Sequence, residues 1–209
     1  ATLGAPNMER RLAAILAADV VGYSRLMGQD EAGTLQELKA IRAEVIDQKV
    51  VEHKGRIFKS TGDGVLAEFT SVVNAVSCAV DIQRAMDGRA VQLRVGVHLG
   101  DVIIEDTDIF GDGVNLAARV EGVAPAGGIA LSASAFEHVG NRLGLAFDDM
   151  GEQSLKNIDR PVKIYSVRLD RVAVAPLAKL GGLSLPKKPS IAVLPFTNMS
   201  GDPEQQHFA

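Results

Sequence analysis

The chain has 209 residues, of which 46% are hydrophobic and 23% charged, and its net charge at pH 7 is -4. This length has room for one well-cored domain plus an extension, and the composition is ordinary for a soluble globular protein. The small negative charge gives no general attraction to nucleic acid or to an anionic membrane. Cys78 is the only cysteine, which excludes an intrachain disulfide and a cysteine-based zinc cluster, and we expect it to be a buried structural thiol.

The first residues, 1–9, are expected to form a flexible leader. The apolar residues 12–18 follow two arginines and faintly resemble a signal peptide, but a strand that continues to Val21 explains the run better. No run approaches the roughly 20 apolar residues that a membrane span requires. We therefore expect a cytoplasmic protein without a membrane span.

Residues 11–21 predict a buried strand, because they are apolar almost throughout. Asp19 near its end is an anomaly, since carboxylates are rarely buried without a partner. Residues 22–24 are expected to form a short turn. A long helix should then begin at residues 29–31 and end at residues 53–55, where a glycine is typical of a helix terminus.

Residues 55–69 predict a β-hairpin whose tip is Gly62, Asp63 and Gly64. Residues 65–70 alternate with the two-residue period of a strand, and the glycines allow the backbone angles of a tight turn. Taken alone, an aspartate beside a glycine is best explained by its turn chemistry. The hairpin would nevertheless hold the Asp63 carboxylate at a fixed point.

The remaining elements complete a ferredoxin-like α/β sandwich, an α+β arrangement with strand and helix additions at its C-terminal end. The expected elements are a helix at 71–86, a strand at 91–98, a strand followed by a polar turn at 101–108, a helix at 113–121, a strand at 129–131, a helix at 134–139, and strands at 145–147 and 162–168.

The C-terminal residues differ in composition from this domain, which we place at residues 10–170. Residues 171–189 contain several prolines and glycines and predict a linker. Residues 190–196 predict a new strand, and the chain stops soon afterwards, so we expect it to be cut inside a further domain at 190–209.

Two carboxylates are expected to converge in this fold. The first strand of a ferredoxin-like sheet lies beside the hairpin, so Asp19 and Asp63 could approach each other. Two carboxylates a few ångströms apart repel each other unless one is protonated or a cation lies between them. Oxygen ligands suit Mg²⁺ or Mn²⁺ and leave room for substrate phosphates, which backbone N–H groups of Gly22, Tyr23 and Ser24 could also bind. The sequence thus indicates a metal–triphosphate site.

A second polar cluster lies at residues 108–119. Asn115 and Arg119 are four residues apart and share one helix face, while Val114, Ala117 and Ala118 cover the other side. A solvent-exposed polar face would explain such a pair on its own. Its combination with the two earlier segments favours a functional role.

Together, three ordered motifs resemble the class III nucleotidyl cyclase catalytic domain, over about residues 10–170. They are residues 18–24 (ADVVGYS), residues 59–64 (KSTGDG) and residues 108–119 (DIFGDGVNLAAR). Residues 190–209 resemble, more weakly, the opening of a TolB-like domain.

For the phosphate end of the substrate, this resemblance implies that Asp19 and Asp63 bind two Mg²⁺ or Mn²⁺ ions per site, assisted by the Val20 carbonyl. Residues 22–24 would form the phosphate turn, and Lys156 matches the family's late triphosphate lysine.

For the base and the reacting centre, the resemblance implies that Lys59 and Asp108 read adenine. Guanylate cyclases usually have glutamate and cysteine at these two positions, so this pair favours ATP. Asn115 would orient the ribose and Arg119 would stabilise charge on the reacting phosphate. The implied reaction is attack of the ribose 3′-oxygen on the α-phosphorus, giving cyclic AMP and pyrophosphate.

The family's sites form between two subunits, so a head-to-tail homodimer with two equivalent sites is implied. The arm between Gly100 and Asp108 is shorter than in the mammalian relatives, which leaves the dimer-arm contacts open. Alternative functions are a guanylate cyclase, a nucleotide-binding regulatory domain that has lost catalysis, and a structural ferredoxin-like dimerisation module.

Overall fold

The structure, a computed structural model, describes residues 8–105 and 108–169. In chain order its elements are β1 (Met8–Val20), α1 (Tyr23–Gln29), α2 (Glu31–Ile41), the π-helix η1 (Arg42–Ile46), α3 (Asp47–Glu52), β2 (Arg56–Thr61), β3 (Gly64–Phe69), α4 (Val72–Ala85), β4 (Leu93–Glu105), β5 (Asp108–Phe110), α5 (Asp112–Gly122), β6 (Ile129–Ser132), α6 (Ala133–Val139), β7 (Phe147–Gln153) and β8 (Val162–Val167).

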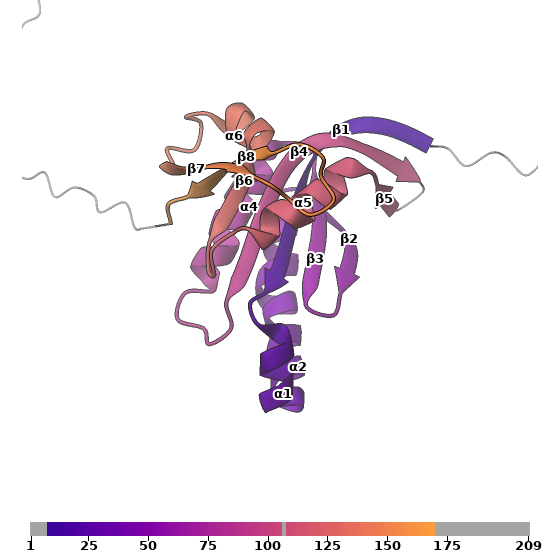
Figure 1. Cartoon of the computed structure of the whole chain (residues 1–209). Coiled ribbons are helices and arrows are strands. Elements are labelled where there is room, and N and C mark those ends of the chain that lie inside the picture. The colour runs from indigo at the N-terminus through magenta and orange to yellow at the C-terminus, as the bar shows by residue number, and fades with distance from the viewer. Residues whose placement is uncertain (1–7, 106–107, 170–209) are drawn as a thin grey trace, which may run out of the picture. The chain divides into compact units, whose positions relative to one another are not determined.

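The strands form one eight-stranded sheet in the order β2-β3-β1-β4-β6-β8-β7, with β5 added beside β4. The first strand lies beside the hairpin, as predicted: β1 pairs antiparallel with β3 on one side and with β4 on the other (Figure 1). β4 and β6 are parallel, and α5 connects the β4–β5 hairpin to β6. The sheet order therefore places the end of β1 against the tip of the β2–β3 hairpin.

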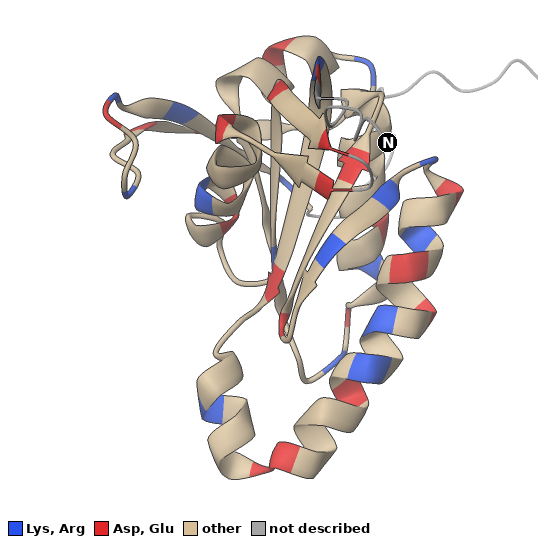
Figure 2. Cartoon of the chain, turned by 90° about the vertical axis from the view of Figure 1, so that its right-hand side faces the viewer, with Lys and Arg blue, Asp and Glu red and all other residues tan. Residues whose placement is uncertain are grey.

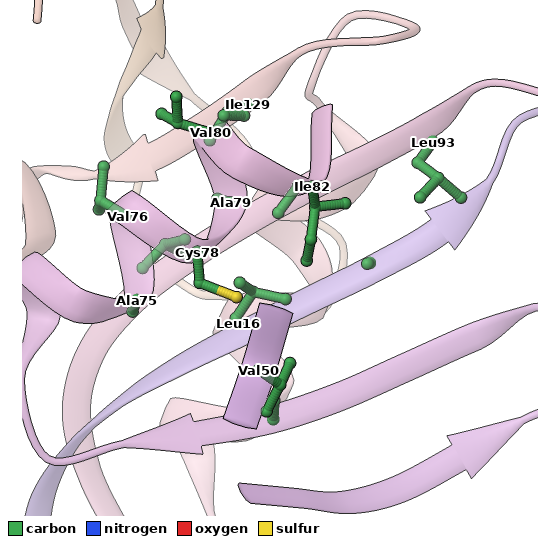
Figure 3. Packing of buried hydrophobic residues seen from close by; sticks show 14 of the residues in the cluster. Leu16, Val50, Ala75, Val76, Cys78, Ala79, Val80, Ile82, Leu93 and Ile129 are labelled. Atoms are coloured by element: carbon green, nitrogen blue, oxygen red, sulfur yellow. The ribbon is translucent and has the colours of Figure 1, made fainter. Parts of the chain in front are cut away.

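Alternate side chains of β1 enter two different cores, which explains why residues 13–18 are all apolar. Ala14 and Leu16 pack beneath α3, α4 and α6, whereas Ala13, Ile15 and Ala17 pack on the face that α5 covers. Each fully buried leucine or isoleucine stabilises the fold by about 1.5–3 kcal/mol. The side chains of the first core that Figure 3 labels are Leu16, Val50, Ala75, Val76, Cys78, Ala79, Val80, Ile82, Leu93 and Ile129.

Cys78 is completely buried in that first core. Burial raises the pKa of its thiol to about 12, so the thiolate is not formed at neutral pH. The prediction of a structural thiol is confirmed.

Helix boundaries follow local capping chemistry. The Asp30 carboxylate accepts a hydrogen bond of 2.9 Å from the Gly33 N–H and begins α2, and the Ser71 hydroxyl accepts one of 3.4 Å from the Asn74 N–H and begins α4. At the other end of the long helical segment, Gly55 follows α3 and leads into β2.

The predicted long helix is interrupted by the π-helix η1. Its i→i+5 spacing matches the ion pair between Arg42 and Asp47, five residues apart, whose Nε–Oδ1 distance is 2.5 Å. Figure 2 shows Lys and Arg interspersed with Asp and Glu along the segment formed by α2, η1 and α3.

Several predicted boundaries were wrong. Residues 8 and 9 do not belong to a leader, because β1 begins at Met8 and pairs with β4 from that residue on. Residues 22–24 are not a free turn, because α1 begins at Tyr23. The two strands expected at 91–98 and 101–108 are one strand, β4, because Gly100 continues the pairing with Ala13 instead of ending it. The strand expected at 145–147 begins only at Phe147 and runs to Gln153.

The predicted linker at 171–189 and the predicted strand at 190–196, with its TolB-like resemblance, lie outside the described residues. None of the helices in residues 8–105 and 108–169 is long and apolar enough to cross a membrane.

Candidate active site

Asp19 and Asp63 come together where β1 ends beside the hairpin tip. Asp19 lies opposite Gly64 in the β1–β3 ladder, and Gly64 directly follows Asp63 in the sequence. A Cβ added at Gly64 would lie 2.7 Å from the Thr61 hydroxyl oxygen and 3.3 Å from Asp19 Oδ1. The absence of a side chain at Gly64 therefore allows Thr61 and Asp19 to approach the hairpin closely, in addition to favouring the turn.

The electrostatics show that the two carboxylates interact. Partial burial and then the charge of Asp63 raise the pKa of Asp19 above its usual value, while the Val20 N–H and the Arg94 guanidinium act in the opposite direction. A divalent cation between two such carboxylates would relieve their repulsion.

Arg94 is a functional candidate that sequence reasoning missed. It lies opposite Asp19 in the β1–β4 ladder, and its buried Nε has no hydrogen-bond partner among the described residues. The signal in the sequence was a charged residue between the buried apolar residues Leu93 and Val95. A buried guanidinium N–H without a partner is costly and fits a site that takes an anion.

Glu121, near the end of α5, was missed as well. Burial, and then the charge of Asp19, raise the pKa of its carboxyl group to about 7. α5 can approach so closely because β4 has a glycine there: a Cβ added at Gly96 would lie 2.2 Å from the Glu121 backbone nitrogen. The charges of Asp19, Asp63 and Arg94 all act on the pKa of Glu121, so this carboxyl group lies in the same electrostatic environment as the carboxylate pair.

The donor set fits a divalent cation that also binds substrate. Among the described residues, no group of three or more His, Cys, Asp or Glu side chains is arranged to hold a metal ion. Asp19 and Asp63 would supply two carboxylates, and the remaining positions would fall to phosphate oxygens, water and the Val20 carbonyl. Such a site suits Mg²⁺ or Mn²⁺.

The segment at residues 22–24 lies beside the same hairpin. Gly22 has a φ of 70°, the left-handed region that favours glycine, and the chain then enters α1 at Tyr23. The Tyr23 hydroxyl is 3.7 Å from the position that a Cβ on Gly62 would occupy. Tyr23 and Ser24 therefore lie in the first turn of α1, next to the hairpin tip.

Lys59 and Asp108 lie on two strands, β2 and β5, that contact each other although they are not paired in the sheet. Lys59 pairs with Leu66 in β2–β3, Asp108 pairs with Glu105 in β4–β5, and β2 and β5 are in contact. Both side chains are exposed, whereas Ile109 between Asp108 and Phe110 is buried.

The other predicted residues are not gathered at this point. Asn115 and Arg119 are exposed on α5, opposite the buried Ala117 that faces the sheet. Lys156 is exposed in the loop between β7 and β8, and β7 forms the sheet edge opposite β2. One chain thus brings together the carboxylate pair, and separately the strands that carry Lys59 and Asp108, but not the full predicted set.

This mixed sheet, with a carboxylate pair at its hairpin and a polar helix face on α5, has the ferredoxin-like arrangement that the order of the elements predicts. Residues 8–168 match the profile of the adenylate and guanylate cyclase catalytic domain, and the chain belongs to that family.

Two relatives of known sequence are described as adenylate cyclases. The chain is 54% identical, over 97% of its length, to a Rhizobium meliloti protein named "Putative adenylate cyclase 3", of which it spans 36%. It is 35% identical, over 56% of its length, to an adenylate cyclase of Streptomyces coelicolor, of which it spans 31%. The chain therefore spans about a third of the length of these two relatives.

Solved structures confirm the predicted fold class. A Silicibacter pomeroyi structure described as an adenylate/guanylate cyclase/hydrolase is 43% identical, with a TM-score of 0.73, over 77% of this chain and 98% of that one. The adenylyl cyclase CyaB of P. aeruginosa is 25% identical, with a TM-score of 0.68, over 77% of this chain and 95% of that one.

Proposed function

We propose that the domain is an adenylate cyclase that converts ATP to 3′,5′-cyclic AMP and pyrophosphate. The observation that carries this proposal is the convergence of Asp19 and Asp63 beside Arg94, at the point where the chain turns through Gly22 into α1. Carboxylates for cations and a guanidinium for phosphate are the groups that a metal–nucleoside triphosphate requires.

In this proposal Asp19 and Asp63 hold two Mg²⁺ or Mn²⁺ ions, with the Val20 carbonyl as an additional ligand. When bound, the cations would lower the pKa of the ribose 3′-hydroxyl and offset charge that develops on the phosphates. The backbone N–H groups of Gly22, Tyr23 and Ser24 contact the triphosphate.

Arg94 adds positive charge at the floor of the site, and its unpaired buried Nε–H offers a donor to a phosphate oxygen. This role for Arg94 follows from its position opposite Asp19 in the β1–β4 ladder.

The proposed base is adenine. Lys59 donates a hydrogen bond to the N1 position and the Asp108 carboxylate accepts one from the 6-amino group, a pairing that guanine would not satisfy. The contact between β2 and β5 supports this assignment, because it brings the strands of both residues together. Two relatives named as adenylate cyclases favour the same substrate.

The proposed enzyme is a head-to-tail homodimer in the cytoplasm. Asn115 would orient the ribose and Arg119 would stabilise the reacting phosphate of the partner's site, where Lys156 would also bind the triphosphate. Their exposure on α5 and on the β7–β8 loop, away from the chain's own carboxylates, supports a shared site.

The test is an assay of the purified chain with Mn²⁺ and either ATP or GTP, measuring cyclic nucleotide and pyrophosphate separately. We expect equal amounts of cyclic AMP and pyrophosphate from ATP, and much less product from GTP. Preference for GTP would favour a guanylate cyclase. Binding of ATP without product at any Mn²⁺ or Mg²⁺ concentration would instead favour a catalytically silent regulatory domain.

A further inference from the structure

Strand β2 changes its register against β3 at Phe58. Ile57 lies opposite Ala67, but Lys59 lies opposite Leu66, so the pairing shifts by one residue between them. Phe58 and Lys59 therefore share one partner residue on β3, which is the arrangement of a β-bulge.

This bulge decides on which face of the sheet Lys59 lies. Ile57 packs against the core beneath α3 and α4, whereas Leu66 packs against the core on the α5 side. Strict alternation from Ile57 would put Lys59 on the face of Ile57. With the register shift, Lys59 shares the face of Leu66 and of Thr61, whose hydroxyl flanks Gly64 together with Asp19.

The Phe58 ring also belongs to the packing between β2 and β5. It is half-buried and packs on the cluster that contains Ile109 of β5 and Ile15 of β1. Because Lys59 follows Phe58 and Asp108 precedes Ile109, the packing that separates the two strands also sets the spacing of Lys59 and Asp108.

We propose that Phe58 is a specificity-positioning residue: its bulge turns Lys59 onto the face of Asp19, and its ring fixes the distance between Lys59 and Asp108. The inference rests on the proposed function, since it concerns how the base is selected. Phe58 itself need not touch the nucleotide, and it acts through the two residues that do.

Phe58→Ala is a usable test because the Phe58 side chain is only half-buried. Strand β2 also borders open space, since a groove of about 510 Å³ lies between α3 and β2 and Ile57, Phe58 and Lys59 are among the residues that line it. Truncation would shorten a partly exposed side chain instead of opening a sealed void, so we expect a folded variant. Ile57→Ala is the matched control, since it removes a half-buried apolar side chain from the adjacent position of β2 but on the opposite face.

The measurement is kcat/KM for ATP and for GTP, together with the thermal midpoint of unfolding. We expect Phe58→Ala to lower the ATP-over-GTP ratio roughly tenfold, mainly through KM for ATP. Phe58→Leu should recover most of the ratio. Ile57→Ala should lower the midpoint but keep the ratio within about twofold of wild type.

Equal losses of stability in the Phe58→Ala and Ile57→Ala variants, with an unchanged ratio, would overturn the inference. If the wild-type chain forms no cyclic nucleotide, the proposed function fails, and the same variants are compared by competition of ATP and GTP for binding. A wild-type preference for ATP that Phe58→Ala loses would then support the positioning role. If Phe58→Ala keeps the preference for ATP, or if the wild-type chain has no such preference, the positioning role is overturned.

Discussion

Asp19 and Asp63 repel each other in the absence of a cation, so their proposed role in binding metal can be tested separately from any effect on stability. The raised pKa of Asp19, caused by burial and by Asp63, shows that the pair costs the fold free energy. Removing Asp63 should therefore not destabilise the protein.

For Asp63→Ala we expect loss of at least about a hundredfold in cyclic AMP formation, because metal-ion stabilisation is worth several kcal/mol. The thermal midpoint without metal should equal or exceed that of wild type. Mn²⁺ with ATP should raise the midpoint of wild type but not of the variant. Unchanged turnover would remove Asp63 from the metal site.

His98 offers a second prediction at the residue scale. It is buried in β4, and its Nδ1 lies 2.8 Å from the Ser132 hydroxyl oxygen, which in turn lies 3.0 Å from that of Ser134. The Ser134 hydroxyl donates to the Leu99 carbonyl at 2.7 Å. Burial lowers the pKa of His98 to about 4 in the folded protein.

Between pH 4 and 6.5 the unfolded chain binds a proton at His98 that the folded chain does not, so stability should fall as pH falls through this window. At pH 5 this protonation of the unfolded chain lowers the free energy of unfolding by about 2 kcal/mol relative to pH 8. We expect the free energy of unfolding of His98→Gln, measured with denaturant, to fall less between pH 8 and pH 5 than that of wild type. Parallel pH profiles of the two proteins would contradict this assignment.

Some site residues could be predicted from sequence and others could not, for a physical reason. Asp19 and Asp63 stand out because one interrupts an apolar strand and the other lies between two glycines. The importance of Arg94 and Glu121 depends on the pairing of β4 with β1 and on the approach of α5, which are long-range contacts.

At the scale of elements, the position of α5 depends on one glycine of β4. A Cβ at Gly96 would lie 2.5 Å from the Glu121 Cα and 2.8 Å from the Ala117 carbonyl oxygen, and backbone atoms cannot move aside cheaply. Gly122 in the same helix has nothing within 4 Å of the corresponding position.

We therefore expect Gly96→Ala to cost roughly 1–3 kcal/mol in the free energy of unfolding. It should also lower turnover, because α5 carries Asn115 and Arg119. Gly122→Ala is the matched control and should be neutral or slightly stabilising. Denaturant unfolding and turnover of both variants check this, and equal behaviour of the two would show that helix–strand contact at Gly96 does not matter.

The elements that sequence patterns predicted well are those whose cause is local. Asp30 and Ser71 cap their helices, and alternation marks the hairpin strands. The bulge at Phe58 and the continuity of β4 through Gly100 were not predicted, because each depends on pairing with another strand. The π-helix η1 was not predicted either. The bulge matters most, since alternation alone would assign Lys59 to the wrong face.

At the scale of the whole molecule, the fold class and the neighbourhood of β1 and the hairpin followed from element order. The order of the elements does not predict which substrate site receives the exposed face of α5 and the β7–β8 loop. Asn115 and Arg119 face away from the sheet that carries Asp19. A second copy of the chain would supply what one copy lacks.

This arrangement predicts complementation between two inactive variants. In a head-to-tail dimer, a heterodimer of Asp63→Ala and Asn115→Ala has one site with both defects and one site with neither. Random mixing makes half of the dimers heterodimers, so an equimolar mixture should recover about a quarter of wild-type turnover. Each variant alone should be nearly inactive.

The control is a mixture of Asp63→Ala with Asp19→Ala, which place their defects in the same half of the site. No heterodimer of that pair contains an intact site, so its turnover should stay at the level of either variant alone. Recovery in the first mixture but not in the second would require that Asp63 and Asn115 act across the subunit boundary. If light scattering shows dimers but the first mixture recovers no turnover, each chain completes its own site. In that case α5 would have to rotate its Asn115 face toward Asp19 on binding nucleotide.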